Sequence, residues 1–200
     1  MEAKSVRESR AVKSAIILPS DTNNMGTIFG GKVMAYIDDI GGLSALRHAR
    51  TSVVTASTDS VDFLHPIQTD QSICLESFVT WTRNTSMEVF VKVIGENLRT
   101  GERIVCATSF LTFVALDDQG KPHPVPAVIP ETEMEKKLYD SAPDRAKHRM
   151  ERRKQSKLLA QEFGVAKPWE TVKAAHSVTP RRQNLEFIAS GIMKPVKSCH

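Results

Sequence analysis

The chain has few of the features that mark membrane, secreted or metal-binding proteins. No apolar run approaches the ~18 residues of a membrane span, and the first 15 residues lack the hydrophobic segment of a secretory signal. The three cysteines (Cys74, Cys106 and Cys199) do not have metal-site spacing. The first two lie in apolar, strand-like runs and are predicted as small core residues. We therefore expect a cytoplasmic protein without a metal ion, with no membrane contact.

Basic residues are scarce in the first part of the chain and concentrated in the last. Residues 1–120 contain 11 Lys and Arg against 14 Asp and Glu, whereas residues 121–200 contain 16 against 9. Such a segment is either a solvated face or a site for phosphate groups. It lacks the interleaved aromatic residues of single-strand binders and the apolar face of a membrane helix. We therefore expect no nucleic-acid partner.

The hydrophobic pattern predicts one long helix followed by a run of antiparallel strands. Val33, Ile37 and Ile40 have helical spacing within an expected helix from about Gly31 to His48. Alternating, β-branched stretches then follow, namely SVVTASTDSVDFLHPI, SICLESFVTWT, SMEVFVKVIGEN and RIVCATSFLTFVALDD. The turns between them are short, as in antiparallel neighbours. The predicted fold class is α+β, with a sheet curled around a helix.

The stretch DTNNMGTIFGGKVMAYIDDIGG, residues 21–42, contains the unusual chemistry of the chain. Two carboxylates, Asp38 and Asp39, lie in a helix that is apolar or small on most sides. A carboxylate in such a place is costly unless it is paired or used. The helical neighbours of Asp38 are Met34, Gly41 and Ala45, so a solvated face suits Asp38 poorly and a functional role is favoured.

These residues resemble acyl-coenzyme A thioesterases of the hotdog fold, most closely the YciA-type and brain-type cytosolic acyl-CoA hydrolases. The motif is D-x-N-x-x-G-x-x-x-G-G with an acidic residue seven positions after the second glycine. The resemblance covers residues 7–120 and implies a hotdog domain there. Residues 121–130 are predicted as a proline-rich linker and residues 131–200 as a basic C-terminal helical extension, broken near Ser141.

The resemblance implies hydrolysis of acyl-CoA to a free acid and coenzyme A, without a cofactor. Asn23 and Asp38 match the catalytic pair, which comes from opposite subunits of a homodimer; Asn24 and Asp39 are their alternatives. Gly30 and Gly31 match the glycines that bind the thioester oxygen. Family members often assemble further, so we expect a trimer of dimers, a hexamer. Whether Asp38 acts as general base or as nucleophile stays open.

The coenzyme A moiety of the substrate needs cationic partners for its phosphates and hydrogen bonds for its pantetheine arm. The family places the turn RNTSME beside that arm, which makes Arg83, Thr85 and Ser86 candidates. Seven basic residues lie between Arg145 and Lys157 against one acid. From this segment the phosphate candidates are Arg145, Arg149, Arg152 and Arg153.

Two other functions fit parts of the sequence. A hotdog domain can sense acyl-CoA without cleaving it, but such regulators lack the Asn–Asp pair and usually carry a DNA-binding domain. A hotdog dehydratase uses a histidine in a motif that is absent here, and His65 before a proline is interpreted as structural. Chain-length preference depends on a tunnel beside the helix, for which Met34, Tyr36 and Phe63 are candidate lining residues.

Overall fold

The computed structural model describes residues 1–165, in two units that divide between Arg152 and Arg153. Cys199 and the rest of the C-terminal tail lie outside the described residues. The elements, with η1 a 3-10 helix, are β1 (Lys4–Ser5), α1 (Val6–Ser9), β2 (Ala11–Ile16), η1 (Pro19–Asp21), α2 (Gly30–Ala49), β3 (Ser52–Phe63), β4 (Gln71–Thr82), β5 (Ser86–Asn97), β6 (Arg103–Leu116), β7 (Val128–Ile129), α3 (Glu133–Asp140) and α4 (Ala142–Phe163).

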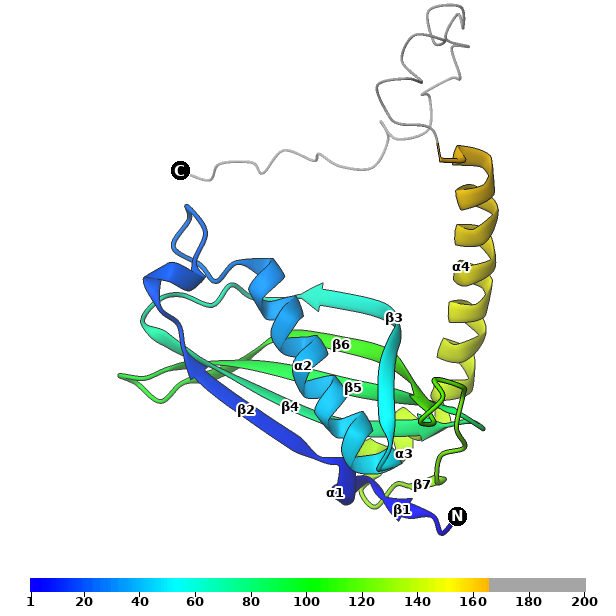
Figure 1. Ribbon diagram of the computed structural model, residues 1–200. Helices are drawn as coiled ribbons and strands as arrows, with labels where there is room; N and C mark the ends of the chain where they lie inside the picture. Colours follow the sequence, from blue (N-terminus) through cyan, green and yellow to red (C-terminus); the bar gives the residue numbers. More distant parts are fainter. Residues whose placement is uncertain (166–200) are drawn as a thin grey trace, which may run out of the picture. The chain divides into compact units, whose positions relative to one another are not determined.

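Five strands form one antiparallel sheet in the order β2-β4-β5-β6-β3, with α2 across one face (Figure 1). The predicted α+β hotdog arrangement is therefore confirmed. The alternation along β5 is clear, because Met87, Val89, Val91 and Val93 all turn inward and are completely buried. The residues between them, Glu88, Phe90 and Lys92, point to the opposite face, as the two-residue period of a strand requires.

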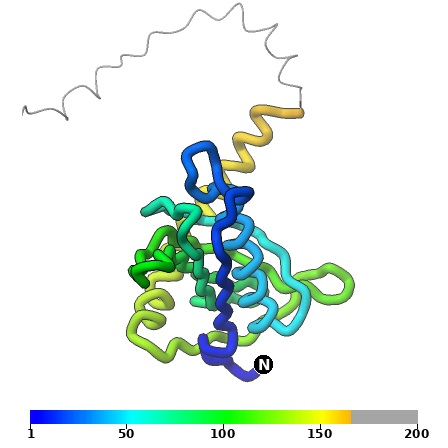
Figure 2. Tube along the Cα trace, turned by 90° about the vertical axis from the view of Figure 1, so that its left-hand side faces the viewer, coloured from blue at the N-terminus to red at the C-terminus, as the bar shows by residue number. Residues whose placement is uncertain are grey.

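The central helix α2 runs from Gly30 to Ala49, one residue longer at each end than predicted. It lies lengthwise along the sheet (Figure 2). Val33, Ile37 and Ile40 are buried, as their spacing predicted. A Cβ on Gly41 would lie 3.2 Å from the ring of Phe113, so this glycine permits close packing between the helix and β6.

The first ten residues contain a short strand and a short helix that contact distant parts of the chain. β1 pairs in parallel with β7, far along the chain. Arg10 forms ion pairs with Glu76 of β4 and with Glu135 of α3, the latter at 2.6 Å. These contacts lie within the first compact unit, Met1–Arg152.

The second face of the sheet is partly covered by α3 and the beginning of α4. Phe78, Phe90 and Phe110 form a row of tilted aromatic contacts there, and the guanidinium of Arg145 lies 4.2 Å above the ring of Phe110. Helix α3 ends at Asp140, so the predicted break near Ser141 is confirmed. In the second unit, α4 continues to Phe163 with exposed side chains.

Candidate functional site

The glycine pair forms the first turn of α2. Phe29 precedes it and supplies no side-chain cap for the helix. The first N–H groups of a helix have no intrahelical partner and lie at the positive end of its dipole. A Cβ on Gly31 would overlap the ring of Phe29, and one on Gly30 would lie 3.6 Å from Phe63. The absence of side chains keeps this helix start accessible, and its N–H groups can bind a developing oxyanion.

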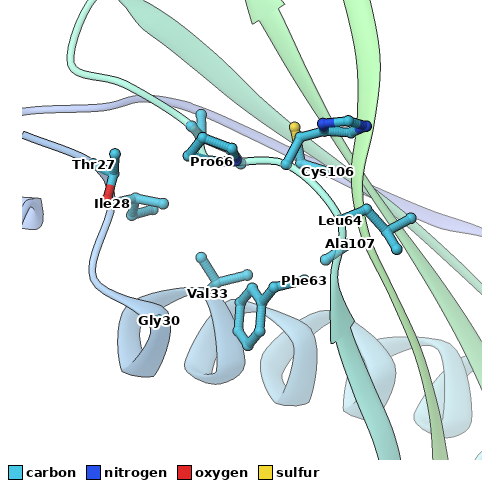
Figure 3. A pocket seen from close by; sticks show the side chains of 11 residues that line it. Thr27, Ile28, Gly30, Val33, Phe63, Leu64, Pro66, Cys106 and Ala107 are labelled. Atoms are coloured by element: carbon cyan, nitrogen blue, oxygen red, sulfur yellow. The ribbon is translucent and has the colours of Figure 1, made fainter. Parts of the chain in front are cut away.

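An apolar cavity of about 250 Å³ opens beside this helix start (Figure 3). Its walls come from the loop before α2, the first turns of α2, the end of β3 with the loop that follows it, and the first half of β6. The lining residues are Thr27, Ile28, Gly30, Val33, Phe63, Leu64, His65, Pro66, Ile67, Cys106 and Ala107. Since most of these side chains are apolar, the cavity suits an apolar group attached to whatever binds at Gly30.

Cys106 is buried, whereas Cys74 is only half-buried, so the prediction that both lie in the core is confirmed for Cys106 alone. Burial raises the pKa of the Cys106 thiol, which makes this thiol a poor nucleophile at neutral pH. His65 donates its backbone N–H to the Cys106 carbonyl at 3.2 Å. The thiol of Cys106 is therefore a poor candidate for the reacting group, and this backbone bond fixes the position of His65 in the cavity wall.

Asn23 lies in the loop before α2 and organises that loop. Its side-chain oxygen accepts the backbone N–H of Met25 at 2.9 Å, and its amide donates to the hydroxyl of Thr27 at 3.0 Å. Thr27 is itself part of the cavity wall. The loop thus ties Asn23 to the start of α2 and leaves its side chain exposed.

Asp38, which the motif spacing selects, and its neighbour Asp39 have different partners in the structure. Asp38 accepts a hydrogen bond from the hydroxyl of Thr55 on β3, at 2.8 Å. Asp39 points to the other side of α2 and pairs with Lys13 of β2 at 2.9 Å. Thr55 was not among the predicted site residues, and no local motif marks it, because it lies 17 positions from its partner.

One chain does not bring the predicted catalytic pair together. Asp38 is eight positions after Gly30 in α2, a rise of about 12 Å. Asn23 lies before the helix start, and Asp38 does not line the cavity. A site that uses both residues therefore needs a second copy of the chain.

The turn between β4 and β5 contains the candidates for the pantetheine arm. The N–H of Arg83 donates to the Ser86 carbonyl at 2.9 Å, and the Thr85 carbonyl accepts the N–H of Ala115 on β6, also at 2.9 Å. The Arg83 side chain is exposed, while Thr85 and Ser86 are half-buried. The backbone of this turn is fixed, and the Arg83 guanidinium is accessible to a ligand.

Three of the four arginines expected on the coenzyme A phosphates have protein carboxylates as partners instead. Arg145 pairs with Glu88 at 2.7 Å, Arg149 contacts both Glu88 and Asp59, and Arg152 pairs with Asp59 at 2.7 Å. Arg153, the fourth, is an exposed residue at the start of the second unit. The structure therefore gives three of the seven basic residues in this segment a carboxylate partner.

The described residues were also compared with the requirements of a metal site and of a membrane-spanning helix. Among residues 1–165, no three potential His, Cys, Asp or Glu ligands gather closely enough to hold a metal ion. None of the helices in that part of the chain combines the length and apolar character that a membrane crossing needs.

Residues 25–102 match the family model of the thioesterase superfamily. A Bacillus subtilis protein named as an uncharacterized acyl-CoA thioester hydrolase, YkhA, is 58% identical over 168 residues, which are 84% of this chain and 98% of YkhA. The mouse cytosolic acyl coenzyme A thioester hydrolase is 36% identical over 146 residues. Those residues are 72% of this chain but only 38% of the mouse protein.

Solved structures have the same fold. The acyl-CoA hydrolase of Staphylococcus aureus, in complex with butyryl coenzyme A, coenzyme A and coenzyme A disulfide, has a TM-score of 0.77 at 45% identity, over 80% of this chain and 98% of that one. Its alanine variants at one asparagine, one aspartate and one threonine have also been solved. A hexameric acyl-CoA thioesterase has a TM-score of 0.75 at 53% identity, over 76% of this chain and 97% of that one.

Proposed function

Because the chain belongs to the acyl-CoA thioester hydrolases of the thioesterase superfamily, it is a hydrolase, and we propose that it cleaves acyl-CoA to a carboxylic acid and coenzyme A. The observation that carries the proposal is the uncapped, glycine-containing start of α2 beside an apolar cavity. Thioester hydrolysis needs donors for a developing oxyanion and a space for the acyl chain. The N–H groups of Gly30 and Gly31 supply the donors, and the cavity supplies the space.

Asp38 and Asn23 complete the site, each from a different copy of the chain. Thr55 holds one Asp38 oxygen at 2.8 Å, which leaves the other oxygen free to take a proton from water. Asn23 orients that water or the thioester carbonyl. In the Staphylococcus aureus hydrolase, the three alanine variants are at an asparagine, an aspartate 15 positions later and a threonine 17 positions after that. Asn23, Asp38 and Thr55 have the same spacing, which supports these assignments.

A homodimer is the proposed active unit. In the described part of the chain, β3 is an edge strand with β6 as its one neighbour. Apolar side chains are exposed along this edge and the adjoining side of α2, among them Met34, Val54 and Phe63. An edge of this kind favours pairing with a second chain. The hexameric relative supports further assembly into a trimer of dimers.

Coenzyme A is proposed to lie along the β4–β5 turn, with Arg83, Thr85 and Ser86 beside its pantetheine arm. Arg153, which belongs to the second unit, stays a separate candidate for phosphate binding. Arg83 and Arg153 are both exposed. A relative named cytosolic supports a cytoplasmic location.

The test is thiol release from a series of acyl-CoAs, from acetyl to palmitoyl, by wild type, Asp38→Asn and Asp39→Asn. Asp39→Asn is the matched control, because it removes the neighbouring carboxylate, which pairs with Lys13. We expect turnover by wild type and the control, and at least a hundredfold loss in Asp38→Asn, since general base catalysis contributes ~10²–10⁴-fold. Acyl-CoA binding without turnover by wild type would instead indicate a sensor. Equal turnover by all three would show that neither aspartate is catalytic.

A further inference from the structure

A buried charge network connects the interior strand β5 to the edge strand β3. Glu88 on β5 is completely buried and accepts hydrogen bonds from Arg145, the shortest at 2.7 Å. Arg149 lies between Glu88, at 3.5 Å, and Asp59 of β3, which is 11% exposed. Arg152 donates to the Asp59 carboxylate at 2.7 Å and to its backbone carbonyl at 2.9 Å. Buried carboxylates are costly unless they are paired and hydrogen-bonded, so this network fixes its members in place.

Asp59 lies in an irregular part of β3. The pairing of β3 with β6 shifts register twice, between Thr55 and Ser57 and between Thr58 and Ser60. Asp59 is the extra residue at the second shift. Such bulges bend a strand and change the direction of nearby side chains. The network thus holds the bulged segment of β3 through its side chain and its backbone.

Thr55 stands immediately before the first shift, and its hydroxyl holds Asp38. The direction of that hydroxyl follows from the path of β3 through the two bulges. In residues 1–165, β6 is the one strand that pairs with β3, and the two register shifts interrupt that pairing at the bulged segment. Arg149 supports this segment, because it joins Asp59 to the buried Glu88.

We propose that Arg149 is a positioning residue, which sets the path of β3 and thereby the direction in which Thr55 holds Asp38. The inference rests on the proposed catalytic function of Asp38. It replaces the expectation that Arg149 binds a phosphate of coenzyme A. The Arg149 side chain is only 13% exposed, and the two carboxylates that it contacts would repel a phosphate.

The test compares wild type, Arg149→Lys and Arg103→Gln on butyryl-CoA and on S-butyryl-pantetheine, which has no phosphates. One nitrogen of Arg149, Nη1, contacts both Asp59 and Glu88. Lysine keeps the positive charge, but its side chain is one bond shorter, so its ammonium cannot occupy the position of Nη1 between the two carboxylates. Arg103→Gln is the control, because Arg103 is 68% exposed and pairs with Glu96 at the surface. We expect Arg149→Lys to lower kcat/KM about tenfold on both substrates and to leave KM for butyryl-CoA within about twofold, because a misplaced catalytic group mainly lowers kcat.

A rise in KM for butyryl-CoA alone would assign Arg149 to phosphate binding and overturn the proposal. Unchanged kinetics in Arg149→Lys would overturn it as well. If Arg149→Lys does not fold, as judged by thermal unfolding and size-exclusion chromatography, Asp59→Asn takes its place with the same expected pattern. Failure of the proposed function is distinguishable, because wild type itself would then release no thiol.

A second measurement tests the route through Thr55. If Arg149 acts by way of this residue, Arg149→Lys should cost less than about twofold in a Thr55→Val background, since two changes in one pathway are not additive. A full tenfold loss in that background would show that Arg149 acts independently of Thr55, and would refute the positioning route.

Discussion

Replacing Thr55 by valine removes one hydrogen bond to the proposed catalytic carboxylate and little else. The hydroxyl donates to Asp38 at 2.8 Å, and both residues are exposed in the single chain. A hydrogen bond to a charged group contributes ~1.5–3 kcal/mol. With water available to replace the donor, the lower value applies, and kcat should fall about tenfold, at ~1.4 kcal/mol for each factor of ten. Where a second copy covers this edge and excludes water, the upper value gives a loss of about a hundredfold.

Thiol release from butyryl-CoA measures kcat and KM, with Thr55→Ser as the matched control. Serine keeps the hydroxyl, so its kcat should stay within about threefold of wild type. The free energy of unfolding of the valine variant should lie within ~0.5 kcal/mol of the wild-type value, because an exposed strand position tolerates valine well. Wild-type kcat in Thr55→Val, beside an inactive Asp38→Asn, would refute the idea that this hydrogen bond prepares Asp38 for catalysis.

Two further predictions concern the packing and titration of α2. Gly41→Ala should destabilise the protein by about 1 kcal/mol in urea unfolding, because the new Cβ would lie 3.2 Å from the buried ring of Phe113; Gly42→Ala, where that distance is 3.7 Å, should instead stabilise it by up to ~1 kcal/mol. Burial lowers the pKa of His48, which hydrogen-bonds the Pro126 carbonyl at 2.9 Å. Below pH 6.5 the imidazole of the unfolded chain therefore binds a proton that the native imidazole does not bind. As the pH is lowered through this range, the free energy of unfolding should decrease by up to ~1.4 kcal/mol per pH unit. His48→Gln should remove this component of the slope, and an unchanged slope would contradict the assignment.

The helix and the sheet were predictable because their signals are local and repeat. The spacing of Val33, Ile37 and Ile40 identifies the buried stripe of α2, and strict alternation identifies the inward side of β5. Neither signal depends on distant residues. The bulges of β3 are different, because a register shift is defined only relative to β6. The sequence therefore predicts that β3 exists but not where its side chains point.

The sequence of the N-terminus does contain a local signal for the start of helix α1. Ser5 accepts the N–H of Arg7, and Glu8 accepts the N–H of Ser5, a capping box with the S-x-x-E spacing. The helix that it starts is only four residues long, too short for a hydrophobic period. β1, with two residues, is equally invisible, since its partner β7 follows more than 120 positions later. Local sequence patterns therefore do not predict the structure of the N-terminus where it depends on pairing with a distant strand.

The site was predictable as a motif and not as a geometry. The spacing of Asn23, the glycine pair and Asp38 is read directly from the chain and favours Asp38 over Asp39, but the sequence could not predict the partner of either aspartate. The structure does so, because one residue faces β3 and the other faces β2. No local motif identifies Thr55 either, because its contact with Asp38 depends on how the edge strand β3 packs beside the helix.

The basic segment shows why charge counts mislead when their partners are distant. Arg145 lies 57 positions from Glu88, and Arg149 lies 90 from Asp59. Composition counts these arginines as free positive charge, and free positive charge suggests a phosphate ligand. Two acids on the folded sheet cancel much of that charge locally, and the arginines become supports for β3. Exposed residues such as Arg83 and Arg153 are then the candidates for attracting coenzyme A. Arg83→Gln should therefore raise KM for acyl-CoA and leave kcat unchanged. This is the reverse of the pattern expected for Arg149→Lys.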